Sequence, residues 1–170
     1  QWQADIVRWA LRKGRAAIFA DCGLGKTFMQ VAWADALKVR TLMLAPLCVA
    51  EQTVGEAAKL GVSVTYAREQ ADAEGHCIVI TNYERLDKFD VSQFDAVVLD
   101  ESSILKAFDG KTRTALIQAF AATKYRLCCT ATPSPNDIAE LANHAGFLGL
   151  MTRPEFLATW FIRIDQGQRT

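Results

Sequence analysis

The sequence has no excess of charge of either sign. Its 19 Lys and Arg residues balance 19 Asp and Glu residues, so the 170-residue chain has a formal net charge of +0. Proteins that hold nucleic acid or anionic membranes through overall charge are strongly basic. Nothing in the composition therefore points to nucleic acid or to an anionic membrane, and any contact with nucleic acid has to be local or supplied by a missing partner domain.

Long apolar runs, a leader segment and paired cysteines are also missing. No apolar stretch is long enough to cross a bilayer, and no secretory signal is visible. The five cysteines are odd in number and include no Cys-x-x-Cys pair, which argues against both a disulfide framework and a zinc site. We therefore expect a cytoplasmic protein with reduced thiols and no membrane partner.

A glycine-rich segment from Ala20 to Thr27 is the most informative feature that is present. It follows the apolar run Ala16–Phe19 and precedes an amphipathic stretch, Phe28–Leu37. A strand, a glycine-rich turn with Lys-Thr and a helix together form the context of a phosphate-binding loop. Small residues let backbone N–H groups surround an anion, and the following helix points its positive end toward that anion. Ala20 stands where the usual pattern has glycine, and its small side chain still allows the loop to close.

This loop predicts ATP and Mg²⁺ as cofactors. Lys26 would reach the β- and γ-phosphates, and the Thr27 hydroxyl would hold the metal ion. The remaining residues whose backbone forms the predicted loop are Cys22, Gly23, Leu24 and Gly25.

An acidic pair follows a second apolar run. Residues Ala96–Leu99 are apolar and lead directly into Asp100 and Glu101. The carboxyl ends of strands are where open α/β sheets bind their ligands. Asp100 can hold the Mg²⁺ shell, and Glu101 can orient and deprotonate an attacking water. We therefore expect the loop and the acidic pair to converge on one triphosphate.

Apolar strands alternate with helical patterns along the chain, which predicts an α/β fold with a mainly parallel sheet covered by helices on both faces. Ser134 is expected to cap a further helix with Pro135 at its first position. We assign no element to residues 153–170. The remaining expected strands are Thr41–Ala45, Val62–Tyr66, Cys77–Thr81 and Tyr125–Thr130, and the remaining expected helices are Val49–Leu60 and Thr112–Ala121.

A second Gly-Lys-Thr sequence at Gly110 is not a second phosphate loop. No glycine-rich turn precedes it, and Leu105 occupies the place of the opening glycine. Asp109 and Gly110 are better interpreted as a turn that leads into a helix.

Taken in order, these blocks resemble superfamily 2 helicases and translocases, in particular the Swi/Snf-like branch and its phage-encoded relatives. The loop matches motif I, and Gln3 looks like the adenine-recognition glutamine. The other matching blocks are Leu44–Leu47 for motif Ia, Ile80–Glu84 for motif Ib, Asp100–Ser103 for the Asp-Glu box and Thr130–Pro133 for motif III.

The resemblance implies a RecA-like domain that hydrolyses ATP in a cleft shared with a second such domain. Residues 1–170 look like the first, N-terminal domain of a longer helicase-like protein, without the second domain and its arginine finger. Such an arginine is worth about 10³–10⁵ in turnover in related enzymes, so the chain by itself should hydrolyse ATP very slowly.

The same resemblance implies roles for individual residues. Catalysis falls to Lys26 and Glu101, magnesium binding to Thr27 and Asp100, and adenine recognition to Gln3. Coupling of hydrolysis to movement falls to Ser103, Thr130 and Thr132. Contact with nucleic acid, with double-stranded DNA as the implied partner, falls to Ala45, Pro46 and Thr81.

Two other functions compete with the motor. A regulatory nucleotide-binding module that acts through protein contacts is mildly favoured by the neutral net charge. A small-molecule kinase also uses a phosphate loop, but it gives no reason for the Thr130–Pro133 block, and no acceptor-binding lid is recognisable. The sequence leaves open whether strands are separated or only tracked, and in which direction.

Overall fold

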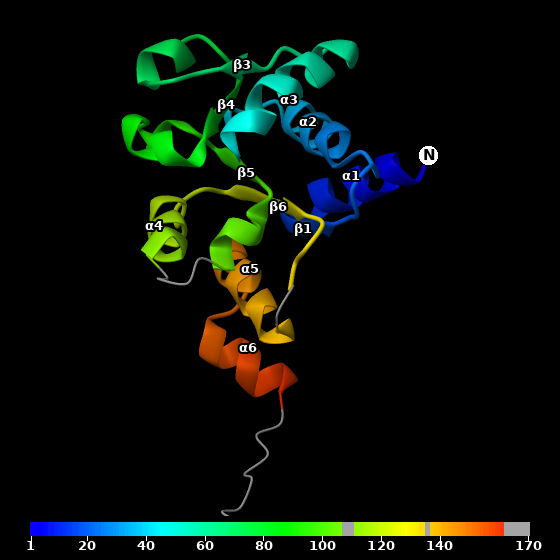
Figure 1. Cartoon of the computed structure of the whole chain (residues 1–170), viewed down its shortest axis with the longest axis vertical. Helices are drawn as coiled ribbons and strands as arrows, with labels where there is room; N and C mark the ends of the chain where they lie inside the picture. Colours follow the sequence, from blue (N-terminus) through cyan, green and yellow to red (C-terminus); the bar gives the residue numbers. More distant parts are fainter. Residues whose placement is uncertain (107–110, 135–136, 162–170) are drawn as a thin grey trace, which may run out of the picture.

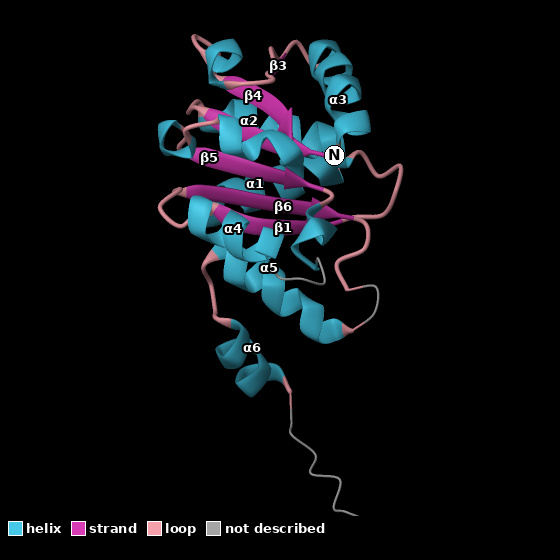
Figure 2. Cartoon of the chain, turned by 60° about the vertical axis from the view of Figure 1, so that its left-hand side comes forward, coloured by secondary structure: helices cyan, strands magenta, loops and turns pink. Residues whose placement is uncertain are grey.

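An all-parallel sheet forms the centre of the computed structural model, which describes residues 1–106, 111–134 and 137–161. Within these residues the sheet has six strands in the order β1-β6-β5-β2-β4-β3. The strands are β1 (Arg15–Phe19), β2 (Thr41–Ala45), β3 (Thr65–Tyr66), β4 (Ile78–Asn82), β5 (Ala96–Asp100) and β6 (Tyr125–Thr130). Because all strands run the same way, their carboxyl ends lie at one edge of the sheet (Figures 1 and 2).

Helices cover both faces of this sheet, as Figure 2 shows. The α-helices are α1 (Trp2–Lys13), α2 (Lys26–Leu37), α3 (Leu47–Lys59), α4 (Lys111–Ala119), α5 (Leu141–Leu148) and α6 (Arg153–Trp160). The 3₁₀ turns are η1 (Gln70–Ala73), η2 (Tyr83–Lys88), η3 (Val91–Gln93), η4 (Ser102–Lys106) and η5 (Ile138–Glu140). This architecture confirms the α/β fold with helices on both faces.

Alternating strand residues feed two separate cores. In β2, Met43 packs into the core beneath α1, α2 and α3, whereas its neighbours Leu42 and Leu44 pack into the core beneath α4 and α5. Every residue of β2, β4 and β5 is buried. The continuous apolar runs in the sequence therefore reflect strands that are buried on both faces.

Several predicted boundaries differ from the structure. The expected strand Val62–Tyr66 is reduced to β3, and the expected helix Val49–Leu60 begins earlier, at Leu47, directly after Pro46. Asp100 lies inside β5 rather than after it. The helix α4 begins at Lys111, and the predicted turn at Asp109 and Gly110 lies outside the described residues.

The prediction that Ser134 caps a helix is wrong. The cap is Asp137, whose side chain accepts the Ala139 N–H at 2.8 Å at the start of η5, and α5 follows. Pro135, which was expected at the first helical position, lies outside the described residues. A carboxylate can satisfy a free N–H at a helix start as well as a serine hydroxyl can.

The amino-terminal edge of the sheet is held by two arginines in register. Arg15 and Arg126 are partners in the first position of the β1–β6 ladder. The Arg126 guanidinium is buried and donates to the carbonyls of Ala121 (2.6 Å), Thr123 (3.0 Å) and Phe147 (2.6 Å). The two arginines thereby bind carbonyls that follow α4 and end α5, where the helix dipole favours a cation.

The end of α5 requires glycine because of these arginines. Gly149 has a φ of 67°, and a Cβ there would lie 2.9 Å from Nη1 of Arg15 and 3.3 Å from Nη1 of Arg126. Both the left-handed backbone and the close approach exclude a larger residue without strain.

Near the carboxyl terminus, α6 begins with a capping box that the sequence analysis missed. The Thr152 side chain accepts the Glu155 N–H, and the Glu155 carboxylate accepts the Thr152 N–H at 2.8 Å.

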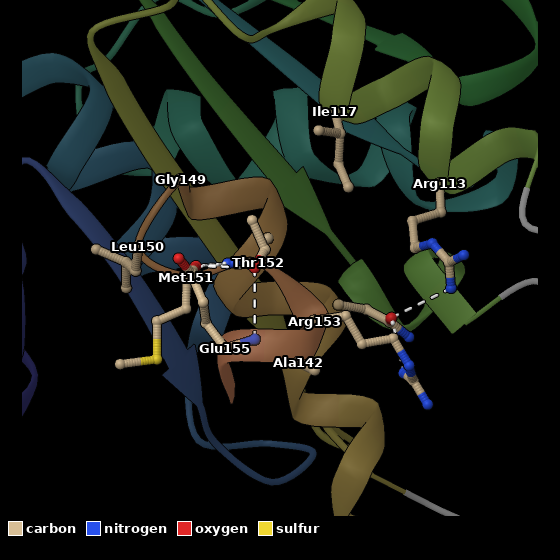
Figure 3. A pocket seen from close by; sticks show the side chains of 11 residues that line it. Arg113, Ile117, Ala142, Gly149, Leu150, Met151, Thr152, Arg153 and Glu155 are labelled. Carbon is tan, nitrogen blue, oxygen red and sulfur yellow. Dashed lines mark hydrogen bonds between the residues drawn. The ribbon is translucent and has the colours of Figure 1, made fainter. Parts of the chain in front are cut away.

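A cavity of about 440 Å³ lies between α4, α5 and α6 (Figure 3). On one side of it, Arg113 and Arg153 both donate to the Asn143 side-chain oxygen, at 3.2 and 3.4 Å. This shared acceptor connects the three helices.

Candidate active site

The predicted phosphate loop and the predicted acidic pair lie at the same edge of the sheet. The loop follows β1 and the pair ends β5, and β6 lies between these two strands. The Ala20 N–H donates to the Thr130 carbonyl at 3.2 Å, which ties the start of the loop to the end of β6. Residues that are far apart in the sequence therefore meet at the edge where parallel sheets bind ligands.

Glycine allows the loop to bend before α2. Gly25 is left-handed, with a φ of 75°, and a Cβ added there would lie 2.4 Å from Nε2 of Gln3. That same Gln3 nitrogen donates to the Leu24 carbonyl at 3.0 Å. The start of α1 is therefore docked against the loop, and the glutamine predicted to recognise adenine contacts the loop backbone directly.

The loop offers positive charge without a bound carboxylate. The Lys26 ammonium donates to the carbonyls of Ala20 (2.9 Å) and Asp21 (3.2 Å), and within the described residues no carboxylate forms an ion pair with it. The helix α2 has no side-chain cap and no acidic residue in its first turn. Free N–H groups, the helix dipole and an uncompensated lysine together fit an anion such as a phosphate chain.

The first residue of the acidic pair is buried and held from two sides. Asp100 is 5% exposed, and its Oδ1 accepts hydrogen bonds from Nε2 of Gln30 at 2.6 Å and from the Glu101 N–H at 3.1 Å. Burial raises the pKa of Asp100, and the Glu101 charge adds to the rise, while the Gln30 hydrogen bond and the Lys26 charge lower it. The net rise indicates a carboxylate that lacks full compensation, which a bound cation would supply.

Gln30 is a site residue that the sequence analysis missed. It is fully buried on α2, three residues after Thr27, so it lies on the side of the helix that faces the end of β5. A buried glutamine on a helix that otherwise has buried apolar residues was the available signal, because buried polar groups need partners.

The second acidic residue, Glu101, has a left-handed backbone with a φ of 49°. Its Oε2 accepts a hydrogen bond from the Thr130 hydroxyl at 3.3 Å, and the Thr132 N–H donates to that hydroxyl at 3.1 Å. Thr130 thus joins the acidic pair to the block predicted to couple hydrolysis to movement. Ser103 contacts the pair differently, because its hydroxyl donates to the Glu101 carbonyl at 3.4 Å.

His144 lies buried behind the acidic pair. Its Nε2 is 3.1 Å from the Ser102 hydroxyl, and its ring meets Phe19 edge-on with the centroids 5.2 Å apart. The Ser102 contact joins α5 to the segment that follows β5, and the Phe19 contact joins it to the end of β1. This histidine therefore serves packing at the sheet edge.

Tyr83 reaches the acidic pair from the neighbouring part of the sheet. It follows β4, and its hydroxyl donates to the Asp100 carbonyl at 2.6 Å. Burial raises the pKa of this hydroxyl, and the Asp100 charge raises it further. The sequence analysis placed Tyr83 within motif Ib but did not anticipate this contact, because β4 and β5 are separated in the sheet by β2.

The residues predicted to contact nucleic acid differ in accessibility. Ala45 and Thr81 end up buried at the carboxyl ends of β2 and β4, while Pro46 is partly exposed and the adjacent Leu47 is 60% exposed. A cavity of about 350 Å³ opens here, lined among others by Pro46, Tyr83 and Glu101. The accessible part of this edge is thus the turn after β2 and the mouth of this cavity.

Magnesium would be held by few protein groups. Among the residues that the structure describes, no three His, Cys, Asp or Glu side chains are placed to hold a metal ion. A site with one hydroxyl (Thr27) and one carboxylate (Asp100) fits Mg²⁺, which keeps several waters and binds substrate phosphates.

All five cysteines are free thiols, as predicted.

No helix in the described part of the chain has both the length and the apolar character needed to cross a membrane.

A glycine-rich loop after an edge strand, an acidic pair two strands away and a parallel sheet between helices define a RecA-like nucleotide-binding domain. The chain belongs to the SNF2-related domain family, whose model matches residues 2–161. No curated protein sequence matches the chain.

Solved structures share this fold. The SWI2/SNF2 ATPase core of Sulfolobus solfataricus, solved with dsDNA, superposes with a TM-score of 0.76 at 21% identity, covering 98% of this chain and 40% of that one. The UvsW helicase of bacteriophage T4 gives a TM-score of 0.70 at 14% identity, covering 89% of this chain and 57% of that one. The Hef helicase domain of Pyrococcus furiosus gives a TM-score of 0.70 at 14% identity, covering 87% of this chain and 36% of that one. The chain therefore spans between about a third and three fifths of the length of these proteins.

Proposed function

We propose that this chain is the ATP-binding motor domain of a DNA-dependent ATPase of the helicase and translocase type. It hydrolyses ATP with Mg²⁺ when a second RecA-like domain completes the cleft. The observation that carries the proposal is the junction at the end of β6, where Thr130 contacts both the phosphate loop and the Glu101 carboxylate. Membership of the SNF2-related family supports the same function.

The residues at this edge divide the chemistry between them. Lys26 and the N–H groups at the start of α2 bind and neutralise phosphate oxygens, and Gln3 orients the base beside the loop. Thr27 and Asp100 would hold Mg²⁺, which would supply charge neutralisation for phosphoryl transfer. Glu101 orients a water and accepts its proton. The arginine finger comes from the second domain.

Removing the lysine tests the phosphate loop. We expect Lys26→Ala to lower ATP affinity at least 100-fold, measured by titration of a fluorescent ATP analogue, because the loop loses its only ammonium group. Lys59→Ala is the control, because Lys59 is exposed at the end of α3. Equal affinities of the two variants would remove Lys26 from the site.

Changing the acidic pair separates binding from hydrolysis. In the full-length protein, Glu101→Gln should bind ATP like the unchanged protein and lose steady-state turnover at least 100-fold, because the amide cannot accept a proton. Normal turnover in this variant would exclude Glu101 as the base.

A salt titration tests the DNA partner. Binding of double-stranded DNA by the full-length protein should weaken steeply between about 50 and 200 mM salt, since phosphate contacts release counterions. Absence of DNA binding at low salt, together with normal ATP binding, would favour a regulatory module that acts on proteins.

A further inference from the structure

Asp100 is the point where two parts of the site meet. Its side chain is held by Gln30 from α2, the helix that follows the phosphate loop. Its main-chain carbonyl is held by Tyr83, which follows β4 at the edge proposed to contact nucleic acid. The nucleotide side and the nucleic-acid side of the domain therefore hold the same residue through different atoms.

The carbonyl that Tyr83 holds determines where Glu101 points. This oxygen belongs to the peptide group between Asp100 and Glu101, and the orientation of that group is tied to the φ of Glu101, which is 49°. A left-handed backbone costs a residue other than glycine about 1 kcal/mol or more, so it persists only where neighbours hold it. The 2.6 Å bond from Tyr83 is such a restraint, and it acts from outside the acidic segment.

The end of β4 has hydrogen-bonding capacity that the structure leaves unused. The side-chain oxygens of Thr81 and Asn82 are buried and have no hydrogen-bond partner in the described structure. Buried polar atoms without partners are costly, and they gain partners when a segment shifts or binds a ligand. These two residues immediately precede Tyr83 in the chain.

Tyr83 lines the same cavity as the carboxylate proposed to act in catalysis. The cavity of about 350 Å³ is lined by Pro46, Tyr83 and Glu101, among others. Tyr83 therefore bonds the segment that follows β4 to the 100–101 peptide.

We propose that Tyr83 is a positioning residue that sets the orientation of Glu101 and makes hydrolysis responsive to nucleic acid bound at the ends of β2 and β4. The inference rests on the proposed function, because it assigns Tyr83 to the link between its two halves. Tyr83 touches no reacting atom. It acts through the Asp100 carbonyl, and this route is separate from the one through Thr130, which bonds the Glu101 side chain.

The test is Tyr83→Phe in the full-length protein, with kcat and KM for ATP measured with and without double-stranded DNA. The ring remains and only the hydroxyl is lost, so ATP KM and DNA affinity should stay within about twofold. The DNA-stimulated kcat should fall about 10- to 100-fold, since small displacements of a catalytic group have effects of this size. The ratio of stimulated to unstimulated turnover should fall with it.

Two further variants show whether an effect of Tyr83→Phe comes from the lost hydroxyl. Tyr66→Phe is the matched control, because Tyr66 is also half-buried at the end of a strand and no hydrogen bond to its hydroxyl is seen in the described structure. The Tyr66→Phe variant should keep the rates of ATP hydrolysis measured with and without DNA. Replacement of Tyr83 by 4-aminophenylalanine returns a donor at the same ring position and should restore most of the stimulated rate. A role in folding alone would instead lower the melting temperature without changing the ratio.

Stimulated turnover within twofold of the unchanged protein in Tyr83→Phe would overturn the proposal. If the unchanged protein hydrolyses ATP but gains nothing from DNA, the proposed function fails instead. The positioning role is then decided by unstimulated kcat, where a tenfold loss in Tyr83→Phe supports it and an unchanged rate rejects it.

Discussion

At the amino-terminal edge of the sheet, the Arg126 guanidinium donates three hydrogen bonds to backbone carbonyls. At the carboxyl-terminal edge, Asp100 is buried with a raised pKa, Glu101 has a left-handed backbone, and Thr81 and Asn82 keep buried oxygens without partners in the described structure. The same strands begin at one edge and end at the other. The first edge is therefore rich in hydrogen bonds from arginine to the backbone, and the second contains polar groups whose partners are incomplete.

Each edge also has a glycine that makes room for a polar side chain. Gly149 admits the two arginines at the first edge, and Gly25 admits Gln3 at the second. At the first edge, the close approach of the two arginines to Gly149 holds the end of α5. At the second it brings the start of α1 onto the loop that is proposed to bind phosphate.

The difference between the two edges of the sheet is tested most directly by removing the Arg126 guanidinium. Arg126→Met keeps much of the side-chain volume but removes three hydrogen bonds to backbone carbonyls, of which only Thr123 keeps a second arginine donor, Arg15 at 3.4 Å. We expect the free energy of unfolding to fall by about 3 kcal/mol in urea denaturation. Arg12→Met, at an exposed position on α1, should change it by less than about 0.5 kcal/mol. Similar values for both variants would show that the clamp contributes little.

A smaller loss is expected at Gly149. Gly149→Ala should lower the free energy of unfolding by about 2 kcal/mol, because a strained φ and a clash with Arg15 add together. Gly61→Ala isolates the backbone cost, since Gly61 has a φ of 70° and open space around its Cβ position. It should cost about 1 kcal/mol. Equal losses would mean that Arg15 moves aside freely.

At the opposite edge, a substitution should stabilise the protein. Asp100→Asn removes a poorly compensated buried charge while it keeps an oxygen for Gln30, so we expect a gain of about 1 kcal/mol. The same change should abolish turnover in the full-length protein. Asp87→Asn, at an exposed position, should alter neither quantity. A destabilised Asp100→Asn variant would remove the contrast between the two edges.

The smallest expected effect is the dependence on pH of the stability that Asp100→Asn gains. Because the folded protein raises the pKa of Asp100, the folded state binds this proton more tightly than the unfolded state does. Stability supplied by the proton is present below the ordinary aspartate pKa and is lost as pH rises through the raised value. The advantage of Asp100→Asn over the unchanged domain should therefore vanish at low pH and grow toward neutral pH, as measured by urea denaturation across that range.

Local patterns were sufficient for the elements that place the site. The phosphate loop, the strand before Asp100 and the parallel sheet follow from apolar runs and turn residues that lie close together in the sequence. Cys128 and Cys129 are buried in β6. These features depend on short stretches of chain, so periodicity reveals them.

Contacts between distant segments were not predictable in the same way. The bonds from Gln30 and Tyr83 to Asp100 depend on the strand order and on the direction of α2, which no local pattern contains. Short 3₁₀ turns such as η2 have no strong periodicity. The capping box of α6 was present in the sequence as Thr152 and Glu155, with Phe156 and Trp160 following at helical spacing, and the sequence analysis did not use this signal.

The position of β6 separates the end of β1 from the end of β5. Neighbouring strands lie about 4.8 Å apart, so the ends of these two strands are separated by about 10 Å. The helix α2 closes this gap, because its Gln30 donates to Asp100 at 2.6 Å. With this order of strands, contact between the loop and the acidic pair depends on the direction in which α2 leaves the loop.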